Sequence, residues 1–227
     1  MPRITKISPQ KRKQRVNIFL DEKFAFGLDL ETFSKYNLKI NQEISQEKIE
    51  EILKEEEFLK VYDKTLRFLS FRPRSKKEIK DYFYKKNVGD ETQKMIIKKL
   101  ERLKFLDDKQ FALWWVEQRI TFRPSGKRFL EYELRKKGIN KEIIDEVLKD
   151  EILKGFFQKE EETQEAIVGR VDTSFEFEMA LKAAQKKLHT YQKLSSFEFR
   201  KKMTAFLARR GFPWAVIKEV IDKISAA

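Results

Sequence analysis

The sequence predicts a mainly α-helical protein whose tandem three-helix repeats form an elongated array, preceded by a small N-terminal antiparallel β-hairpin or meander and a helix. The first observation is a repeated phrase, Phe-Arg-Pro-Arg-Ser at residues 71–75 and Phe-Arg-Pro-Ser at residues 122–125. Each copy opens a segment that ends in a basic pair, and a third segment near the C-terminus ends in the same way. Such self-similarity is typical of stacked copies of one supersecondary unit. The second observation is composition: 7 Gly and 5 Pro are too few for a turn-rich all-β protein, and 38% charged residues favour amphipathic helices.

Residues 1–57 are predicted to form the N-terminal β-hairpin or meander with a helical extension. Apolar residues in the first 30 positions fall in β-type runs with partial alternation, and the segments 9–11 and 21–23 have the composition of connecting turns. A short helix is expected over residues 31–40. Ser45 is the predicted N-cap of the helix that follows.

Repeat 1 is predicted to occupy residues 58–106. Its first helix carries apolar residues at helical spacing, and Ser75 with Glu78 forms a capping box at the start of the middle helix. The middle helix should end near residues 87–89, and the third helix should begin at Asp90.

Repeat 2 is predicted over residues 107–153 on the same plan. We expect Asp108 to cap its first helix, Ser125 to cap its middle helix and Asn140 to cap its third helix. Gly138 follows the middle helix at the position where a left-handed residue commonly ends a helix. The inward residues expected on the first helix are Phe111, Trp115, Gln118 and Phe122.

Repeat 3 is predicted over residues 175–227, and its opening Arg-Pro is absent. Ser195 begins another capping box, Gly211 is the expected left-handed residue after the middle helix, and Pro213 suits the first turn of the last helix.

The spacing of the basic pairs predicts an insertion between repeats 2 and 3. The middle helices of repeats 1 and 2 are 51 residues apart, whereas those of repeats 2 and 3 are 73 apart. We therefore place the 22 extra residues within 151–174 and assign residues 154–174 to a linker.

Charge and composition limit the classes of function. The formal net charge of +13, from 50 basic and 37 acidic residues, argues for a polyanionic partner, with nucleic acid as the first candidate and a merely soluble basic protein as the alternative. The absence of Cys excludes disulfides, thiolate catalysis and Cys-ligated metals. No segment approaches the roughly 18 apolar residues of a membrane helix, and the N-terminus lacks an apolar signal core. We expect a cytoplasmic monomer that needs no membrane and no cofactor.

The middle helices and their Arg-Pro boundaries supply the candidate binding residues. Cations in a last helical turn also complement the helix macrodipole, so solvated faces are the alternative to a binding role. An arginine before proline could grip a phosphate or carboxylate, or instead cap the preceding helix or pair with a neighbouring Glu. The candidates are Arg72, Arg74, Lys76, Lys77, Lys85, Lys86, Arg123, Lys127, Arg128, Lys136, Lys137, Arg200, Lys201, Arg209 and Arg210.

The sequence supplies no catalytic constellation, and we predict a non-enzyme. His189 is the only histidine and has no partner for a triad, and no Gly-rich phosphate loop is present. The 20 Phe and three Trp residues mostly fall at helical core spacing, so core packing is favoured over base stacking. Trp114, beside the inward Trp115, is the aromatic residue expected to be exposed.

Several runs of residues resemble the RecX family of bacterial recombination regulators. They are Tyr-Asp-Lys-Thr-Leu-Arg-Phe-Leu at 62–69 before the first Arg-Pro phrase, then Lys-Lys-Glu-Ile at 76–79 and Leu-Asp-Asp at 106–108. The second Arg-Pro, the run Lys-Lys-Gly-Ile at 136–139 and the degenerate third copy fit the same family. The resemblance covers residues 58–225, and the preceding segment is similar to the extension of longer members.

The resemblance implies a modulator of the recombinase RecA with roles in recombination, DNA repair and the SOS response. Members are understood to lodge in the groove of the RecA–DNA filament and to limit its growth, strand exchange and coprotease activity, and many also bind DNA. The implied partners are therefore the RecA filament and single- and double-stranded DNA. The family implies no catalytic residues. The absent Arg-Pro of repeat 3 and the insertion before it depart from the family pattern.

Three other functions stay open. The three-helix repeats could act as helix-turn-helix or sequence-tolerant DNA-binding units without a recombinase. They could instead form a scaffold for an acidic protein partner, or, as a distant fourth reading, belong to a nuclease.

Overall fold

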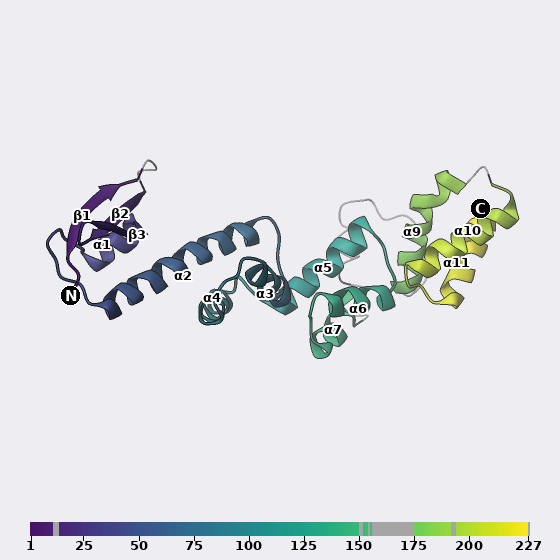
Figure 1. The fold of residues 1–227 in the computed structure, drawn as a ribbon. Helices are drawn as coiled ribbons and strands as arrows, with labels where there is room; N and C mark the ends of the chain where they lie inside the picture. The colour runs from purple at the N-terminus through teal and green to yellow at the C-terminus, as the bar shows by residue number, and fades with distance from the viewer. Residues whose placement is uncertain (11–13, 150–151, 154, 156–174, 192–193, 227) are drawn as a thin grey trace. The chain divides into compact units, whose positions relative to one another are not determined.

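The computed structural model describes residues 1–10, 14–149, 152–153, 155, 175–191 and 194–226 (Figure 1). The chain divides into two compact units. Compact unit 1 comprises Met1–Arg72 with Tyr82–Phe105, and compact unit 2 comprises Pro73–Asp81 with Leu106–Ala227. The N-terminal half of the middle helix of repeat 1 therefore belongs to compact unit 2.

Compact unit 1 begins with the expected meander. Strands β1 (Ile4–Pro9), β2 (Arg15–Leu20) and β3 (Lys23–Asp29) form one antiparallel sheet in the order β1-β2-β3. The turn between β2 and β3 consists of Asp21 and Glu22, with φ of 46° and 66°. Two successive left-handed residues match the twist of the flanking strands, which explains the tight hairpin at this point.

Helices α1 (Leu30–Tyr36) and α2 (Gln46–Ser70) complete this part of compact unit 1. Ser45 caps α2 as predicted, accepting a hydrogen bond from the Lys48 backbone N–H. Glu56 of α2 is buried and pairs with Arg15 at 2.7 Å. The buried apolar side chains of the sheet, α1, α2 and their connections form one cluster: Ile4, Val16, Ile18, Phe26, Leu28, Leu38, Ile44, Ile49 and Ile52.

The helices of repeat 1 are the second half of α2, α3 (Lys76–Lys85) and α4 (Asp90–Arg102). Helix α2 is continuous through residues 57 and 58, where we placed the start of the repeat. Helix α3 ends at Lys85 and is followed by a turn in which Asn87 has a φ of 51°. Leu103, at the end of α4, is 42% exposed because the helix stops one residue before it.

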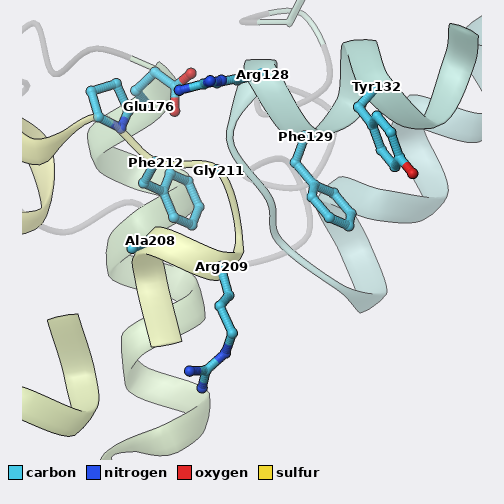
Figure 2. Close-up of a pocket in the computed structure, with 9 residues that line it drawn as sticks. Arg128, Phe129, Tyr132, Glu176, Ala208, Arg209, Gly211 and Phe212 are labelled. Carbon is cyan, nitrogen blue, oxygen red and sulfur yellow. The ribbon is translucent and has the colours of Figure 1, made fainter. Parts of the chain in front are cut away.

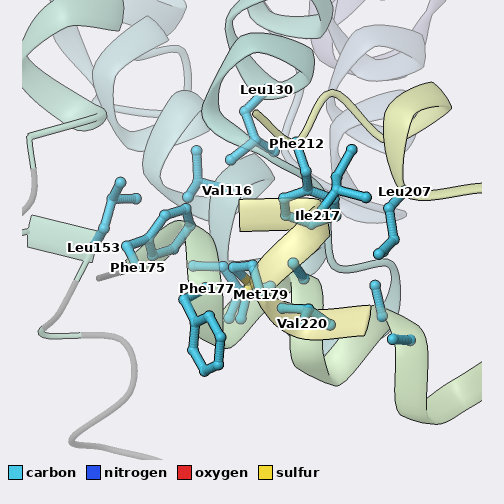
Figure 3. Packing of buried hydrophobic residues seen from close by; sticks show 14 of the residues in the cluster. Val116, Leu130, Leu153, Phe175, Phe177, Met179, Leu207, Phe212, Ile217 and Val220 are labelled. Carbon is cyan, nitrogen blue, oxygen red and sulfur yellow. The ribbon is translucent and has the colours of Figure 1, made fainter. Parts of the chain in front are cut away.

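Compact unit 2 contains the helices of repeats 2 and 3. Repeat 2 consists of α5 (Asp108–Phe122), α6 (Lys127–Lys136) and α7 (Lys141–Val147), and repeat 3 of α9 (Phe175–Tyr191), α10 (Ser196–Arg209) and α11 (Trp214–Ala226). Their buried side chains form one continuous core (Figure 3). Val116 and Leu130 of repeat 2 belong to the same cluster as Met179 and Ile217 of repeat 3. The two repeats therefore share one hydrophobic core.

Several helix ends differ from the prediction. The N-cap of α5 is Asp107, whose carboxylate accepts hydrogen bonds from two backbone N–H groups, so the assignment of Asp108 as N-cap was wrong. Ser125 does not cap α6, because the N-cap is Gly126 and the Ser125 hydroxyl donates to the Arg123 carbonyl. Phe122, expected in the core, is 71% exposed because it is the last residue of α5.

Other helix ends agree with the prediction. Asn140 caps α7, and Ser195 caps α10 in the expected box with Glu198. Gly138 and Gly211 have φ of +80° and +81°, the left-handed conformation expected after a middle helix.

Helix α10 is one turn longer than its two counterparts. It has 14 residues, whereas α3 and α6 each have 10. Its first residue, Ser196, lies 73 positions after Arg123, so the extra turn occupies the place of the Arg-Pro phrase. Proline disfavours helical conformation in the preceding residue, and its absence lets this helix begin earlier.

Candidate interaction surface

The C-terminal end of α6 contacts the N-terminal end of α3, which joins repeat 2 to repeat 1 within compact unit 2. The Ser75 hydroxyl donates to the carbonyl oxygen of Lys137 at 2.7 Å while accepting from the Glu78 backbone N–H at 3.2 Å. The Lys77 ammonium donates to the Lys136 carbonyl at 3.0 Å. The partly negative end of one helix thus meets the partly positive end of another, which is a favourable arrangement of helix dipoles.

The C-terminal end of α10 contacts the N-terminal end of α6 at the equivalent place. The Gly126 backbone N–H donates to the Arg210 carbonyl at 2.9 Å, and the Arg210 guanidinium donates to the Pro124 carbonyl at 3.0 Å. We call these two contacts the 1–2 junction and the 2–3 junction. They show that the repeats are joined through consecutive middle helices.

A carboxylate from the following repeat completes each junction. Asp108 accepts from the Lys76 backbone N–H at 2.8 Å, and Glu176 accepts from the Lys127 backbone N–H at 2.8 Å. These amides belong to first helical turns, where N–H groups have no partner within the helix. Asp108 therefore acts between repeats instead of capping its own helix.

Glycine is required at both junctions for close approach as well as for its backbone conformation. A Cβ atom on Gly138 would lie 2.6 Å from the Cβ of Lys77, and one on Gly211 would lie 2.7 Å from the Cβ of Phe129. Real Cβ atoms essentially never approach so closely. The glycine after each basic pair is thus part of the contact between repeats.

The second cation of the pairs in repeats 2 and 3 is also part of a junction. The Lys137 ammonium pairs with Glu78 at 2.6 Å and lies 4.7 Å from the centre of the Trp115 ring. Arg210 is half-buried and lies 5.0 Å from the centre of the Phe206 ring. These two candidates therefore have structural partners within the chain.

Charged side chains contact both the indole N–H and the ring face of Trp115. Its indole N–H donates to Glu133 at 3.1 Å, and the Arg119 guanidinium lies 4.5 Å from the ring centre. Arg119 also forms a two-point ion pair with Glu133, at 2.6 and 2.9 Å. The residue is half-buried, and its partners fix the ring beside the 1–2 junction.

Positive charge accumulates at the 2–3 junction. Burial, followed by the neighbouring charges of Arg123 and Arg119, lowers the pKa of Arg210 below its ordinary value. An arginine remains charged at neutral pH despite such a shift. The charges of Arg123 and Arg119 add to the effect of burial, so like charges lie near Arg210 at this junction.

The remaining candidates differ in exposure. Arg72, Arg74, Lys76 and Lys127 are half-buried, and Arg200 pairs with Asp222 at 3.0 Å. The exposed candidates are Lys77, Lys85, Lys86, Arg123, Arg128, Lys136, Arg200, Lys201 and Arg209. The first cation of each basic pair is therefore exposed in all three repeats, and only in repeat 1 is the second exposed as well.

Two of these cations flank a groove in compact unit 2. Arg128 and Arg209 lie at its edges, and Phe129, Tyr132 and Phe212 contribute apolar walls to a volume of about 560 Å³ (Figure 2). Tyr132 is not among the predicted binding residues, although its spacing of three residues from Phe129 places both on one helix face.

The exposed tryptophan is also a different residue from the one expected. Trp114 is half-buried, whereas Trp214 at the start of α11 is 68% exposed. Trp114 packs against the core shared by repeats 2 and 3, and the sequence alone does not show that these repeats share a core.

No metal site is found among the residues that the structure describes, since none of them form a group of three or more His, Asp or Glu side chains able to hold an ion. His189 is exposed. Within the same described ranges, no helix is both long and apolar enough to cross a bilayer.

Comparison with protein families gives four matches in chain order. Residues 2–45 match the RecX N-terminal domain, and residues 62–100, 107–148 and 175–221 match the first, second and third RecX three-helix domains.

Known proteins and solved structures give the same result. The Bacillus licheniformis protein named regulatory protein RecX is 36% identical over 98% of this chain and 78% of its own length, and the Bacillus subtilis protein of that name is 35% identical over 99% and 78%. A crystal structure described as regulatory protein RecX aligns over 98% of this chain and all of its own, with a TM-score of 0.64 and 26% identity. RecX from Lactobacillus salivarius has the same fold, with a TM-score of 0.54 and 22% identity over 75% of this chain.

Proposed function

The chain belongs to the RecX family of regulatory proteins, and from this membership we propose that it regulates homologous recombination by binding the RecA–DNA filament. In this proposal the protein occupies the filament groove, inhibits recombinase activity and makes additional contacts with DNA. It acts in the cytoplasm as a monomer and catalyses no reaction.

One observation supports the binding surface in particular. Exposed cations occupy equivalent places at the ends of the three middle helices, and the junction contacts described above do not involve their side chains: Lys85, Lys86, Lys136 and Arg209. Such exposed charges on the rim of an interface mainly accelerate association and depend on salt. Their partners in the proposal are acidic filament surface and DNA phosphates, consistent with a net charge of +13.

A variant that tests partner binding must not disturb the contacts between repeats. Lys137 pairs with Glu78, so reversing its charge would disturb the fold as well as any partner contact. The double variant Lys85→Glu/Lys86→Glu and the single variant Lys136→Glu change exposed side chains only. Lys94→Glu/Lys98→Glu is the matched control, because both lysines are exposed on the third helix of repeat 1.

The test is ATP hydrolysis and strand exchange by the host's RecA on single-stranded DNA, titrated with this protein. We expect inhibition well below one molecule per recombinase subunit. The Lys85/Lys86 and Lys136 variants should require more protein than the control, with a smaller difference at high salt. Absence of inhibition at saturating protein, with DNA binding intact, would refute filament regulation and favour a DNA-binding protein that acts without RecA.

A further inference from the structure

The groove at the 2–3 junction combines two cations with an exposed aromatic surface. It lies between α6 and the connection from α10 to α11, with a volume of about 560 Å³ (Figure 2). This volume falls within the roughly 300–1,000 Å³ typical of small-ligand sites. Arg128 and Arg209 are both exposed at its edges, and Gly211 places bare backbone between them.

The equivalent place at the 1–2 junction is occupied by a lysine side chain. Lys77 packs its stem over Gly138 and donates to the Lys136 carbonyl. Its counterpart 51 residues later is Arg128, whose side chain extends toward Glu176 and leaves the surface of Phe129 accessible (Figure 2). The side chains at these equivalent positions therefore take different directions at the two junctions.

The electrostatic environment of the groove favours an anion. Arg128 and Arg209 are the cations that line the groove. Arg210 belongs to the same junction but not to the groove lining, and burial, then the charges of Arg123 and Arg119, lower its pKa. An anionic group bound in the groove would be attracted to the guanidinium groups of Arg128 and Arg209 at its edges. Arginine forks also match phosphate geometry well. The groove's carboxylate, Glu176, is already bonded to the Lys127 backbone N–H.

The aromatic wall decides which anion fits. Tyr132 is 59% exposed, and its ring centre lies 6.4 Å from that of Phe129 at an angle of 45°. Cations alone would bind any phosphate or carboxylate. Aromatic faces beside arginines form the combination that binds unpaired bases and their backbone together.

We propose that this groove binds one nucleotide of single-stranded DNA. The base stacks on the side chains of Tyr132 and Phe129, and the flanking phosphates pair with Arg128 and Arg209. The inference rests on the DNA-binding part of the proposed function and gives that activity a defined place. An acidic peptide of a protein partner is the competing occupant, and the experiment below separates the two.

The experiment measures binding of the full chain to an oligonucleotide of about 15 nucleotides in the absence of recombinase, within the range of known single-strand site sizes. One central base is 2-aminopurine, whose fluorescence is quenched by stacking. Tyr132→Ala should weaken binding about five- to tenfold, the lower part of the range for one base on one aromatic ring, and should reduce the quenching. Tyr132→Phe should bind as the unaltered protein does. Tyr84→Ala, at an exposed tyrosine on α3, is the matched control.

A second measurement tests the phosphate contacts. For single strands, the slope of log affinity against log salt is about −0.7 per neutralised phosphate. The variant Arg128→Gln/Arg209→Gln should therefore reduce the magnitude of this slope by about 1.4.

Two outcomes would overturn the proposal. One is unchanged affinity and quenching in Tyr132→Ala relative to Tyr84→Ala, with unchanged circular dichroism. The other is unchanged oligonucleotide binding in both groove variants together with weakened capture of the RecA filament, which would assign the groove to an acidic peptide. Either result would leave the proposed regulation of the filament intact, because that proposal is tested by inhibition of RecA.

Discussion

Replacing Gly211 by alanine should separate the end of α10 from the start of α6. The residue has a φ of +81°, and an added Cβ would lie 2.7 Å from the Cβ of Phe129 and 2.9 Å from its backbone nitrogen. Because a backbone atom cannot move aside as the end of a flexible side chain can, the 2–3 junction must open to admit the methyl group.

The expected cost follows from the contacts at this junction. Left-handed conformation in a residue with a Cβ costs about 1–2 kcal/mol. Opening the junction also removes two hydrogen bonds, from Gly126 to the Arg210 carbonyl and from Arg210 to the Pro124 carbonyl. Each contributes about 1 kcal/mol net. The free energy of unfolding of compact unit 2 should therefore fall by about 3–4 kcal/mol, or roughly 10 °C in Tm.

Tryptophan fluorescence during urea denaturation measures this change selectively. All three tryptophans, at positions 114, 115 and 214, belong to compact unit 2. The control is Gly89→Ala in compact unit 1, where an added Cβ meets nothing within 4 Å. That change should cost at most about 1 kcal/mol through its weaker N-cap and should leave the tryptophan transition in place.

A second substitution separates backbone strain from close approach. Asparagine tolerates left-handed conformation, as Asn87 does at the end of α3, but it still carries a Cβ. Gly211→Asn should therefore remain close to Gly211→Ala in stability. Recovery of the original midpoint by asparagine would refute the argument from close approach, and so would a cost below about 0.5 kcal/mol for alanine.

Three further changes test other parts of the structure. Asp108→Ala should lower the free energy of unfolding of compact unit 2 by about 1–2 kcal/mol in urea, because a backbone N–H of α3 loses its acceptor, and an unchanged midpoint would contradict this role. Lys137→Glu should lower the free energy of unfolding by about 1–3 kcal/mol, because it places two carboxylates together. Lys136→Glu, at an exposed position, should change it by at most about 0.5 kcal/mol. Equal denaturation midpoints for the two variants would argue against the ion pair. Burial and then its hydrogen bond to Glu55 raise the pKa of Tyr36. The stability that this contact provides is therefore fully present below the ordinary tyrosine pKa of 10.0, and it is lost as the pH rises toward the higher pKa of the folded protein. Absorbance at alkaline pH should show one late-ionising tyrosine that Tyr36→Phe removes, and its persistence in that variant would contradict the assignment.

Local chemistry accounts for what the sequence predicted correctly. The meander follows from alternation and from the Asp21-Glu22 turn, and the caps at Ser45, Asn140 and Ser195 depend on residues within one helical turn. These interactions span only three or four residues, so their spacing is visible in the sequence. The family resemblance rested on similar short runs and was confirmed over nearly the whole chain.

The errors arose where partners are distant in sequence. Asp108 contacts an amide 32 residues away, and Lys137 contacts a serine 62 residues away, so no local pattern distinguishes them from an ordinary N-cap and a solvated lysine. Ser125 was taken as a cap because of its type, but the carboxylate of Glu176 performs that task from the next repeat. The sequence shows that the basic pair occurs three times. The partial burial of Lys137 and Arg210, the second cations of two of these pairs, depends on contacts between repeats and is not visible in the sequence.

The residues at the two ends of the series of middle helices have a consequence for assembly. Where the end of a middle helix contacts the next middle helix, Gly138 or Gly211 follows it. The exposed residue Asn87 follows α3 instead, and its Cβ would prevent an equally close contact. At the other end, the extra turn of α10 is capped by Ser195, whose hydroxyl forms hydrogen bonds with Glu198. Open-ended stacking of identical surfaces would let molecules polymerise. The two outer ends of the series thus differ from the ends that are joined within the chain, since one is followed by Asn87 instead of glycine and the other carries an extra helical turn.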